Sequence, residues 1–209
     1  MVSNIKDSWY HSDWQNARLK FILSKYSSDF FKGKRILELG ACNGYFSAYF
    51  QSIGAETLAV EGRMENIQKI KEYYPELNVR QSDLDTDDWE WGKWDIIINF
   101  GLYYHLDKYH IKHLENCLDN SEIMLFETVV YDSNKSELYF RDESGYDQSL
   151  TNRGGNPTTS FVEDIFKSKG REYEIFKTNE LNGNGHFYDW EDTGNNIFHQ
   201  NQRRFWIVN

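Results

Sequence analysis

The chain has 209 residues, of which 33 are acidic and 23 basic, giving a formal net charge of −10. This length fits one domain with a real hydrophobic core, and an aromatic content of 17% excludes a disordered chain. The negative charge disfavours both a nucleic-acid binder and a protein that docks on anionic membranes.

The N-terminal segment has no apolar core of a secretory signal. The longest uncharged stretch, Leu39–Ala55, is interrupted by Gly, Asn, Ser and Gln, so no membrane span is expected. Cys42 and Cys117 lie far apart and outside any CxxC pattern, which indicates neither a disulfide framework nor a zinc site. Cys117 has helical spacing to apolar neighbours and is expected in the core. We therefore expect a cytoplasmic protein with no membrane partner.

Strand and helix patterns alternate from the N-terminus onward. A capping box, Ser12-x-x-Gln15, opens a helix whose apolar spacing continues to Phe30. Arg35–Leu39 is typical of a buried strand, and a glycine-containing turn leads from it into a helix over Tyr45–Ile53. Together these segments predict a first strand-turn-helix unit.

Three further strands follow before residue 101. Glu56–Val60 predicts a short strand, and an apolar stripe from Met64 to Tyr74 predicts a helix ended by Pro75. Leu77–Gln81 is a weaker strand pattern. Trp94–Phe100 is a near-continuous β-branched run, typical of a central parallel strand covered on both faces.

The second half continues the alternation with longer interruptions. A helix is expected over Ile111–Leu118 and a strand over Ile123–Val130. A second capping box, Ser160-x-x-Glu163, opens a helix that ends at Gly170. Two late strands close the chain, at Tyr173–Lys177 and Arg203–Val208.

Five strands alternating with helices predict an α/β fold with a doubly wound, mostly parallel sheet. Asp132–Asn156 and Asn179–Gln202 do not fit the alternation and are expected to be long loops, which act as lids or binding loops or are disordered. Ligands of such sheets bind beyond the carboxyl ends of the strands.

Polar residues and glycines gather at four of these strand ends. Glu38–Gly44 places glycines in a strand-to-helix turn, where the backbone can approach a ligand. Glu61 ends the next strand, about 20 residues past the turn, where a carboxylate can accept ribose hydroxyls. Asp83 follows the third strand, and Asn99 ends the fourth. Taken singly, the glycine turn is a weak motif, Glu61 is compatible with a solvated strand end, and Asp83 with an exposed acidic face, but their joint spacing predicts a nucleoside site.

At this point the sequence resembles a family. Glu38–Gly44 is similar to the E-x-G-x-G-x-G loop of class I S-adenosylmethionine-dependent methyltransferases, with Cys42 in place of the middle glycine and with Glu61 and Asp83 at the positions of the ribose and adenine acids. The resemblance covers about residues 30–178 and implies a Rossmann-like sheet of seven strands with S-adenosyl-L-methionine as cofactor. It implies these cofactor-binding residues: Glu38, Gly40, Ala41, Gly44, Tyr45, Glu61, Gly62, Asp83, Leu84, Asn99 and Phe100.

Three segments in order resemble one subgroup, which includes wobble-uridine tRNA-modifying enzymes. Gly40–Ser47 is similar to its G-A-x-x-G-x-F-S turn, Gly101–Leu106 to its G-V-L-Y-H loop, and Leu125–Val130 to its L-x-L-E-T-L-V strand. By that resemblance Phe100 and Tyr104 line the sulfonium side of the cofactor.

A dinucleotide cofactor ranks below S-adenosylmethionine. The pyrophosphate of NAD needs a G-x-G-x-x-G turn, and here Cys42 and Tyr45 stand where its second and third glycines belong.

The candidate catalytic residues are His105 and Tyr104, just past the fourth strand. An imidazole can remove an acceptor proton near neutral pH, although His105 is equally compatible with a role in holding the loop. His110 and His113 lie three residues apart on a helix, and the sequence offers no third metal ligand beside them, so we expect exposed helix histidines and no metal.

The acceptor site is expected in the flanks of the chain. Trp9, Tyr10, His11 and Trp14 form an aromatic lid or a hydrophobic staple at the first helix. His186–Trp190 and Arg203–Trp206 suit a polar ring such as a sugar, or pack an edge strand.

We accordingly divide the domain into an N-terminal helical lid (1–32), a cofactor-binding core (33–178) and a C-terminal loop and edge strand (179–209).

The resulting functional hypothesis is methyl transfer to a small molecule or saccharide. The alternatives are a tRNA wobble-uridine modification enzyme and a non-catalytic S-adenosylmethionine-binding protein, because a fold alone does not determine function. Six acids between Asp83 and Asp95 face one base, Lys93, and are expected to repel a polyanion such as nucleic acid and to favour a neutral or cationic acceptor.

Overall fold

The computed structural model describes residues 12–146 and 148–209. Three members of the expected aromatic lid, Trp9, Tyr10 and His11, therefore lie outside the described residues. The elements of the first half are α1 (Ser12–Lys25), a 3₁₀ helix η1 (Ser28–Phe31), β1 (Arg35–Leu39), α2 (Tyr45–Ser52), β2 (Glu56–Glu61), α3 (Met64–Tyr73), β3 (Val79–Gln81) and β4 (Trp94–Phe100).

The second half contains more strand than the alternation predicts. Its elements are η2 (Tyr103–His105), α4 (His110–Asp119), β5 (Ser121–Ser133), β6 (Leu138–Asp142), β7 (Arg153–Pro157), α5 (Thr159–Ser168), β8 (Tyr173–Phe176), η3 (Asn179–Leu181) and β9 (Asn195–Val208).

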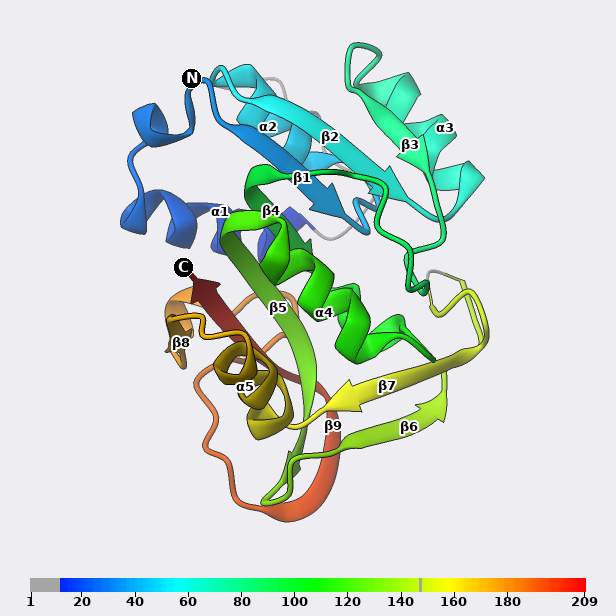
Figure 1. Ribbon diagram of the computed structural model, residues 1–209, viewed down its shortest axis with the longest axis vertical. Coiled ribbons are helices and arrows are strands. Elements are labelled where there is room, and N and C mark those ends of the chain that lie inside the picture. Colours follow the sequence, from blue (N-terminus) through cyan, green and yellow to red (C-terminus); the bar gives the residue numbers. More distant parts are fainter. Residues whose placement is uncertain (1–11, 147) are drawn as a thin grey trace.

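Seven strands form one sheet in the order β3-β2-β1-β4-β5-β9-β8 (Figure 1). The first five pair in parallel, and β9 inserts antiparallel between β5 and β8. This topology confirms the expected doubly wound, mostly parallel α/β fold. Its parallel strands end together, so that Leu39 of β1 is in register with Val60 of β2 and with Asn99 of β4.

Helices cover both faces of the sheet, and side chains of β1 alternate between them. Leu37 and Leu39 pack in the cluster beneath α4 and α5, whereas Ile36 packs with α1 and α2 on the opposite face. Burial of each such aliphatic side chain contributes about 1.5–3 kcal/mol. Glu38 faces the α2 side, which brings a carboxylate beneath the start of α2.

Two helix boundaries differ from the sequence pattern. The helix α1 ends at Lys25 and Phe30 lies in η1, where the chain turns toward β1. The N-cap of α5 is Thr158, whose side-chain oxygen accepts a hydrogen bond from the Phe161 N–H at 3.1 Å. Ser160, the expected cap, lies inside the first turn.

The two segments expected to be loops contain strands. β6 and β7 pair antiparallel over five residues each and form a separate two-stranded sheet. β9 begins at Asn195, eight residues before the expected Arg203. The turn between β6 and β7 extends toward the carboxyl ends of β2 and β3 (Figure 1).

Both histidines of α4 are buried, so the expectation of exposed helix histidines is wrong. His110 and His113 are only 2% and 3% exposed. The His110 ring contacts the Gly155 carbonyl at 3.1 Å, while His113 bonds the Leu84 carbonyl and the Asn99 side chain. Burial disfavours the charged imidazolium and lowers the pKa of both histidines to about 4.

Cys117 is fully buried in the hydrophobic cluster beneath α4 and α5, as expected, and burial raises the pKa of its thiol to about 12. Across residues 12–146 and 148–209, no helix combines the length and the apolar character that a bilayer crossing needs.

Candidate active site

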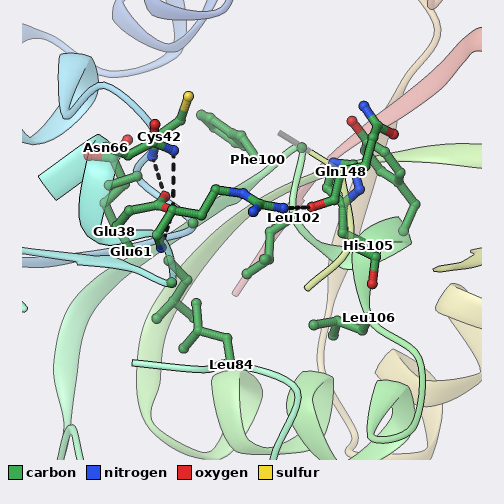
Figure 2. A pocket seen from close by; sticks show the side chains of 18 of the residues that line it. Glu38, Cys42, Glu61, Asn66, Leu84, Phe100, Leu102, His105, Leu106 and Gln148 are labelled. Atoms are coloured by element: carbon green, nitrogen blue, oxygen red, sulfur yellow. Dashed lines mark hydrogen bonds between the residues drawn. The ribbon is translucent and has the colours of Figure 1, made fainter. Parts of the chain in front are cut away.

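A cavity of about 310 Å³ lies at the carboxyl ends of β1, β2 and β4. Its volume is at the lower end of the range for small-ligand pockets. Figure 2 shows the acidic side chains of β1 and β2 on one side of it, with His105 and Leu106 on the other. Residues of α1, of β9 and of the turn between β6 and β7 also line the cavity.

The turn after β1 forms one wall, and Gly40 is required there. Gly40 has a φ of +70°, and a Cβ at this position would lie 2.9 Å from the Cβ of Leu102. Cys42, which replaces the family's middle glycine, adopts a φ of 51° despite its side chain. The turn therefore keeps the left-handed backbone that its glycine pattern predicts.

Glu38 lies at the base of this wall and is 4% exposed. Its Oε2 accepts hydrogen bonds from the Ser47 backbone N–H at 2.8 Å and from the Ser47 hydroxyl at 2.5 Å. Burial nevertheless dominates and raises the pKa of Glu38 to about 7. Its carboxyl group consequently changes charge near neutral pH.

Glu61 is held in place at the end of β2. Its Oε2 accepts from the Cys42 N–H at 2.8 Å, and its Oε1 accepts from the Arg63 N–H and the Asn66 side chain at 2.9 and 3.3 Å (Figure 2). A carboxylate has about four acceptor positions. One position on Oε2 thus remains for a hydroxyl group of a ligand.

The neighbouring residues complete this end of the cavity. Ala41, Gly62, Asp83, Leu84 and Phe100 line it together with Glu38, Gly40 and Glu61. Eight of the eleven residues that the family resemblance assigns to the cofactor are therefore brought to one cavity.

Three assigned residues do not line the cavity. Gly44 faces Ile70 and Leu77, where a Cβ would come within about 3.0 Å of the Leu77 side chain. The Tyr45 hydroxyl donates to the Asn16 side chain at 2.6 Å. Asn99 is fully buried, and its amide bonds His113 at 2.8 Å beneath α4. The sequence places these residues at the turn and at a strand end but does not show which way their side chains point.

His105 and Tyr104 line the opposite end. The Nδ1 of His105 bonds Oε2 of Glu143 at 2.5 Å, and Arg141 bonds the other oxygen of that carboxylate. Glu143 is only 2% exposed and follows β6. Sequence reasoning missed Glu143, because the segment that carries it was expected to be a loop without strands.

A buried ionic cluster lies beside Tyr104. Arg18 of α1 and Arg203 of β9 each contact Oε1 of Glu127 at 2.9 Å. The two guanidinium groups lower the pKa of the Glu127 carboxyl to about 2 despite its burial. Arg203 also donates to the Tyr104 hydroxyl at 3.3 Å.

The turn between β6 and β7 closes over the end of the cavity that contains Glu61 and Gly62. Gln148, Ser149, Leu150 and Thr151 line the cavity, and the Arg63 side chain donates to the Gln148 carbonyl. A Cβ at Gly62 would lie 2.9 Å from the Leu150 side chain. The described part of the chain contains no group of three or more His, Cys, Asp or Glu side chains able to hold a metal ion.

A family model described as "Methyltransferase domain" matches residues 10–168. Among curated proteins, tRNA U34 carboxymethyltransferases of Pseudomonas putida and Pseudomonas fluorescens are each 27% identical over 142 residues, which is 63% of this chain. The chain spans only 42% of the length of these relatives.

Solved structures share the fold at low sequence identity. The N-terminal domain of EvdMO1 with SAH bound has a TM-score of 0.64 and 16% identity, covering 93% of this chain and 78% of that chain. An S-adenosylmethionine-dependent methyltransferase from Clostridium acetobutylicum has a TM-score of 0.63 and 10% identity, covering 92% and 90%. The DhpI-SAM-HEP complex has a TM-score of 0.59 and 12% identity, covering 94% and 87%.

Proposed function

The chain belongs to the methyltransferase domain family and has the fold of class I S-adenosylmethionine-dependent methyltransferases, and from this premise we propose that it transfers a methyl group from S-adenosylmethionine to a small molecule or saccharide. One observation carries the proposal. A single cavity joins a ribose-type carboxylate, Glu61, to a histidine held by a buried carboxylate, His105.

The residues present fit the cofactor. Gly40 leaves room that a Cβ would fill, and Glu61 keeps an acceptor position on Oε2. Asp83 is exposed at the adenine end, where its carboxylate can accept from an amino group. Glu38, Ala41, Gly62, Leu84 and Phe100 would complete the binding surface. When bound, the cofactor supplies a methyl group on a positively charged sulfur.

The chain's own contribution is to position the acceptor and remove its proton. Because the Glu143 side chain also pairs with Arg141, we assign Glu143 as the acceptor and the Nδ1–H of His105 as the donor, which leaves Nε2 to take a proton. Tyr104, fixed by Arg203, would orient the acceptor beside His105. General-base catalysis of this kind contributes about 10²–10⁴-fold.

The walls that enclose the cavity on two further sides favour a small acceptor. The residues Gln148–Thr151 and Trp14, Gln15 and Arg18 of α1 line this space. The division into a helical lid over 1–32, a core and a C-terminal edge remains a prediction. Of the acidic run, Asp85 accepts from the backbone N–H groups of residues 107–109, while Asp83, Asp87, Asp88 and Glu90 are exposed. Such a surface repels a polyanion. A cytoplasmic location remains a prediction.

The proposal is tested by incubating the protein with S-adenosylmethionine carrying a radiolabelled methyl group and with cell extract separated into small molecules, glycans and RNA. We expect label in the small-molecule or glycan fraction. His105→Ala should lose transfer while retaining affinity for S-adenosylhomocysteine, and His199→Ala, an exposed histidine of β9, is the matched control. Label only in RNA, or no label in any fraction despite cofactor binding, would overturn the proposal.

Cofactor binding is tested separately at Glu61. Glu61→Gln keeps the size of the side chain but weakens its acceptor, so affinity for S-adenosylhomocysteine should fall about tenfold. Glu65→Gln, at an exposed position of α3, should leave that affinity unchanged. Equal affinities for both variants would refute the ribose role of Glu61.

Modification of tRNA is the second candidate, because the curated relatives named above are tRNA U34 carboxymethyltransferases. It predicts tRNA binding that survives at about 0.2 M salt. The net charge of −10 argues against such binding, since phosphate contacts need Lys and Arg.

A further inference from the structure

Two arginines face the cavity at the end away from Glu61 and Asp83. Arg18 and Arg203 both line the cavity, and they are 0% and 5% exposed. Their shared counter-ion, Glu127, is fully buried behind them and is not among the cavity-lining residues. The surface presented to a ligand is therefore cationic.

The positive charge of this cluster is not balanced. Two guanidinium groups contact a single carboxylate oxygen, Oε1 of Glu127. The Nε–H groups of Arg18 and of Arg203 have no hydrogen-bond acceptor among the residues that the structure describes. Buried polar groups are normally hydrogen-bonded, and buried charges are normally paired. The cluster thus carries a surplus of one positive charge. Its two Nε–H donors are unpaired, and Oε2 of Glu127 also has no hydrogen-bond donor among the described residues.

Resting on the function proposed above, we propose that the acceptor carries a carboxylate, which binds between Arg18 and Arg203 while its methylated group lies beside His105. A carboxylate supplies one negative charge and two acceptor oxygens, which matches the surplus of one charge and the two unpaired donors. A phosphate dianion would overshoot that surplus. Planar guanidinium groups also suit a carboxylate geometrically.

The position of the cluster assigns this carboxylate to the acceptor. Arg203 donates to the Tyr104 hydroxyl at 3.3 Å, and the chain continues directly from Tyr104 to His105. The adenosine end, marked by Glu61 and Asp83, is formed by other strands. The acidic run accordingly favours a neutral or cationic group only at the adenine end, and the acceptor end has the opposite sign.

The aminoacyl carboxylate of the cofactor is the other source of this chemistry, and two cofactor-like probes separate it from the acceptor. S-adenosylhomocysteine carries that carboxylate, whereas 5′-methylthioadenosine does not. If Arg18 and Arg203 serve the acceptor, Arg203→Met should leave the affinity for both probes within about twofold of wild type. A selective loss of S-adenosylhomocysteine affinity in Arg203→Met would overturn the inference.

The acceptor side is measured by calorimetry in saturating S-adenosylhomocysteine with two matched pairs, D-glucuronate against D-glucose and benzoate against benzyl alcohol. In the wild type we expect the carboxylate member of at least one pair to bind about tenfold or more tightly. Arg203→Met should remove that preference. Arg204→Met, an adjacent buried arginine that does not line the cavity, should retain it and thereby control for folding.

A second variant keeps the test decisive if Arg203→Met does not fold. The double variant Arg203→Met, Glu127→Gln removes one charge of each sign, and it should also lose the preference. The absence of a carboxylate preference in both pairs, in a wild-type protein that binds S-adenosylhomocysteine, would overturn this inference alone. Failure of S-adenosylhomocysteine itself to bind would instead overturn the proposed function.

Discussion

Glu38 makes the stability of the protein depend on pH in a direction unusual for a carboxyl group. Its pKa is raised from an ordinary value of 4.5 to about 7 in the folded chain, because burial penalises the charged form. The folded state therefore holds the proton more tightly than the unfolded state. The stabilisation is fully present below about pH 4.5 and is lost as the pH rises through 7. At 1.36 kcal/mol per pKa unit, the loss is about 3 kcal/mol.

Urea unfolding at pH 5 and pH 8 measures this effect in wild type and in Glu38→Gln. Other groups titrate in the same range, so each protein's free energy of unfolding is measured at both pH values and the two changes are compared. Between pH 5 and pH 8, the free energy of unfolding of the wild type should fall by about 2–3 kcal/mol more than that of Glu38→Gln. Equal changes in both proteins would refute the reasoning.

The protonation state of Glu38 also affects which ligand charge the cavity favours. Glu38 lines the cavity, so a positively charged ligand that binds beside it favours the ionised carboxylate. If only the ionised form binds, affinity for S-adenosylmethionine should rise about tenfold from pH 6 to pH 8. In Glu38→Gln that rise should disappear.

Three further changes have defined outcomes. Glu143→Gln should lower the rate of methyl transfer about 10–100-fold, because His105 loses the carboxylate that holds it, and should leave the affinity for S-adenosylhomocysteine unchanged. A normal rate of transfer would exclude the positioning role of Glu143. Because the pKa of His113 is lowered to about 4, the stabilisation from the neutral side chain is present above pH 6.5 and is lost as the pH falls through 4, at a cost of about 3 kcal/mol. The variant His113→Gln should therefore be less sensitive to acid in unfolding experiments. An unchanged acid transition would contradict the assigned burial. Gly40→Ala should destabilise the protein by about 2 kcal/mol in thermal or urea unfolding, because its φ is +70° and its Cβ would contact Leu102; wild-type stability would show that the turn can relax.

The central strands are predictable from the sequence because their local residue pattern favours a buried strand. Arg35–Leu39 and Trp94–Phe100 are short and mostly apolar segments, which is typical of strands covered on both faces of a sheet, and both strands have the expected bounds. The turn between β1 and α2 is predictable for a different reason, since its glycines adopt positive φ.

The β6–β7 hairpin was not predictable, because its strands lack the usual pattern. Leu138–Asp142 is mostly exposed, and Arg153–Pro157 contains two glycines and a proline, residues that are depleted in strands. Its glycines are there for close packing, as a Cβ at Gly155 would lie 2.6 Å from the His110 ring. Burial of His110 follows from this contact between distant segments, which no local pattern encodes.

The end of the site that we propose for the acceptor also depends on contacts between distant segments. Arg18, Glu127 and Arg203 meet from three elements that are far apart in the chain, and Glu143 arrives from a fourth. The end that we propose for the cofactor is instead built from consecutive strand ends, where position in the sequence determines position in space.

The separation of the β6–β7 hairpin from the main sheet has a consequence for how this protein can diversify. The hairpin satisfies its own strand pairing and adds no strand to the seven-stranded sheet, so its connecting turn can change in length or composition without disturbing the sheet's hydrogen bonds. The turn and its flanks nonetheless supply Glu143 and the residues Gln148–Thr151 of the cavity wall. Exchanging this one segment would therefore change the carboxylate that holds His105 and the wall beside Gly62 and Arg63 together, while the pairing of the seven-stranded sheet stays the same.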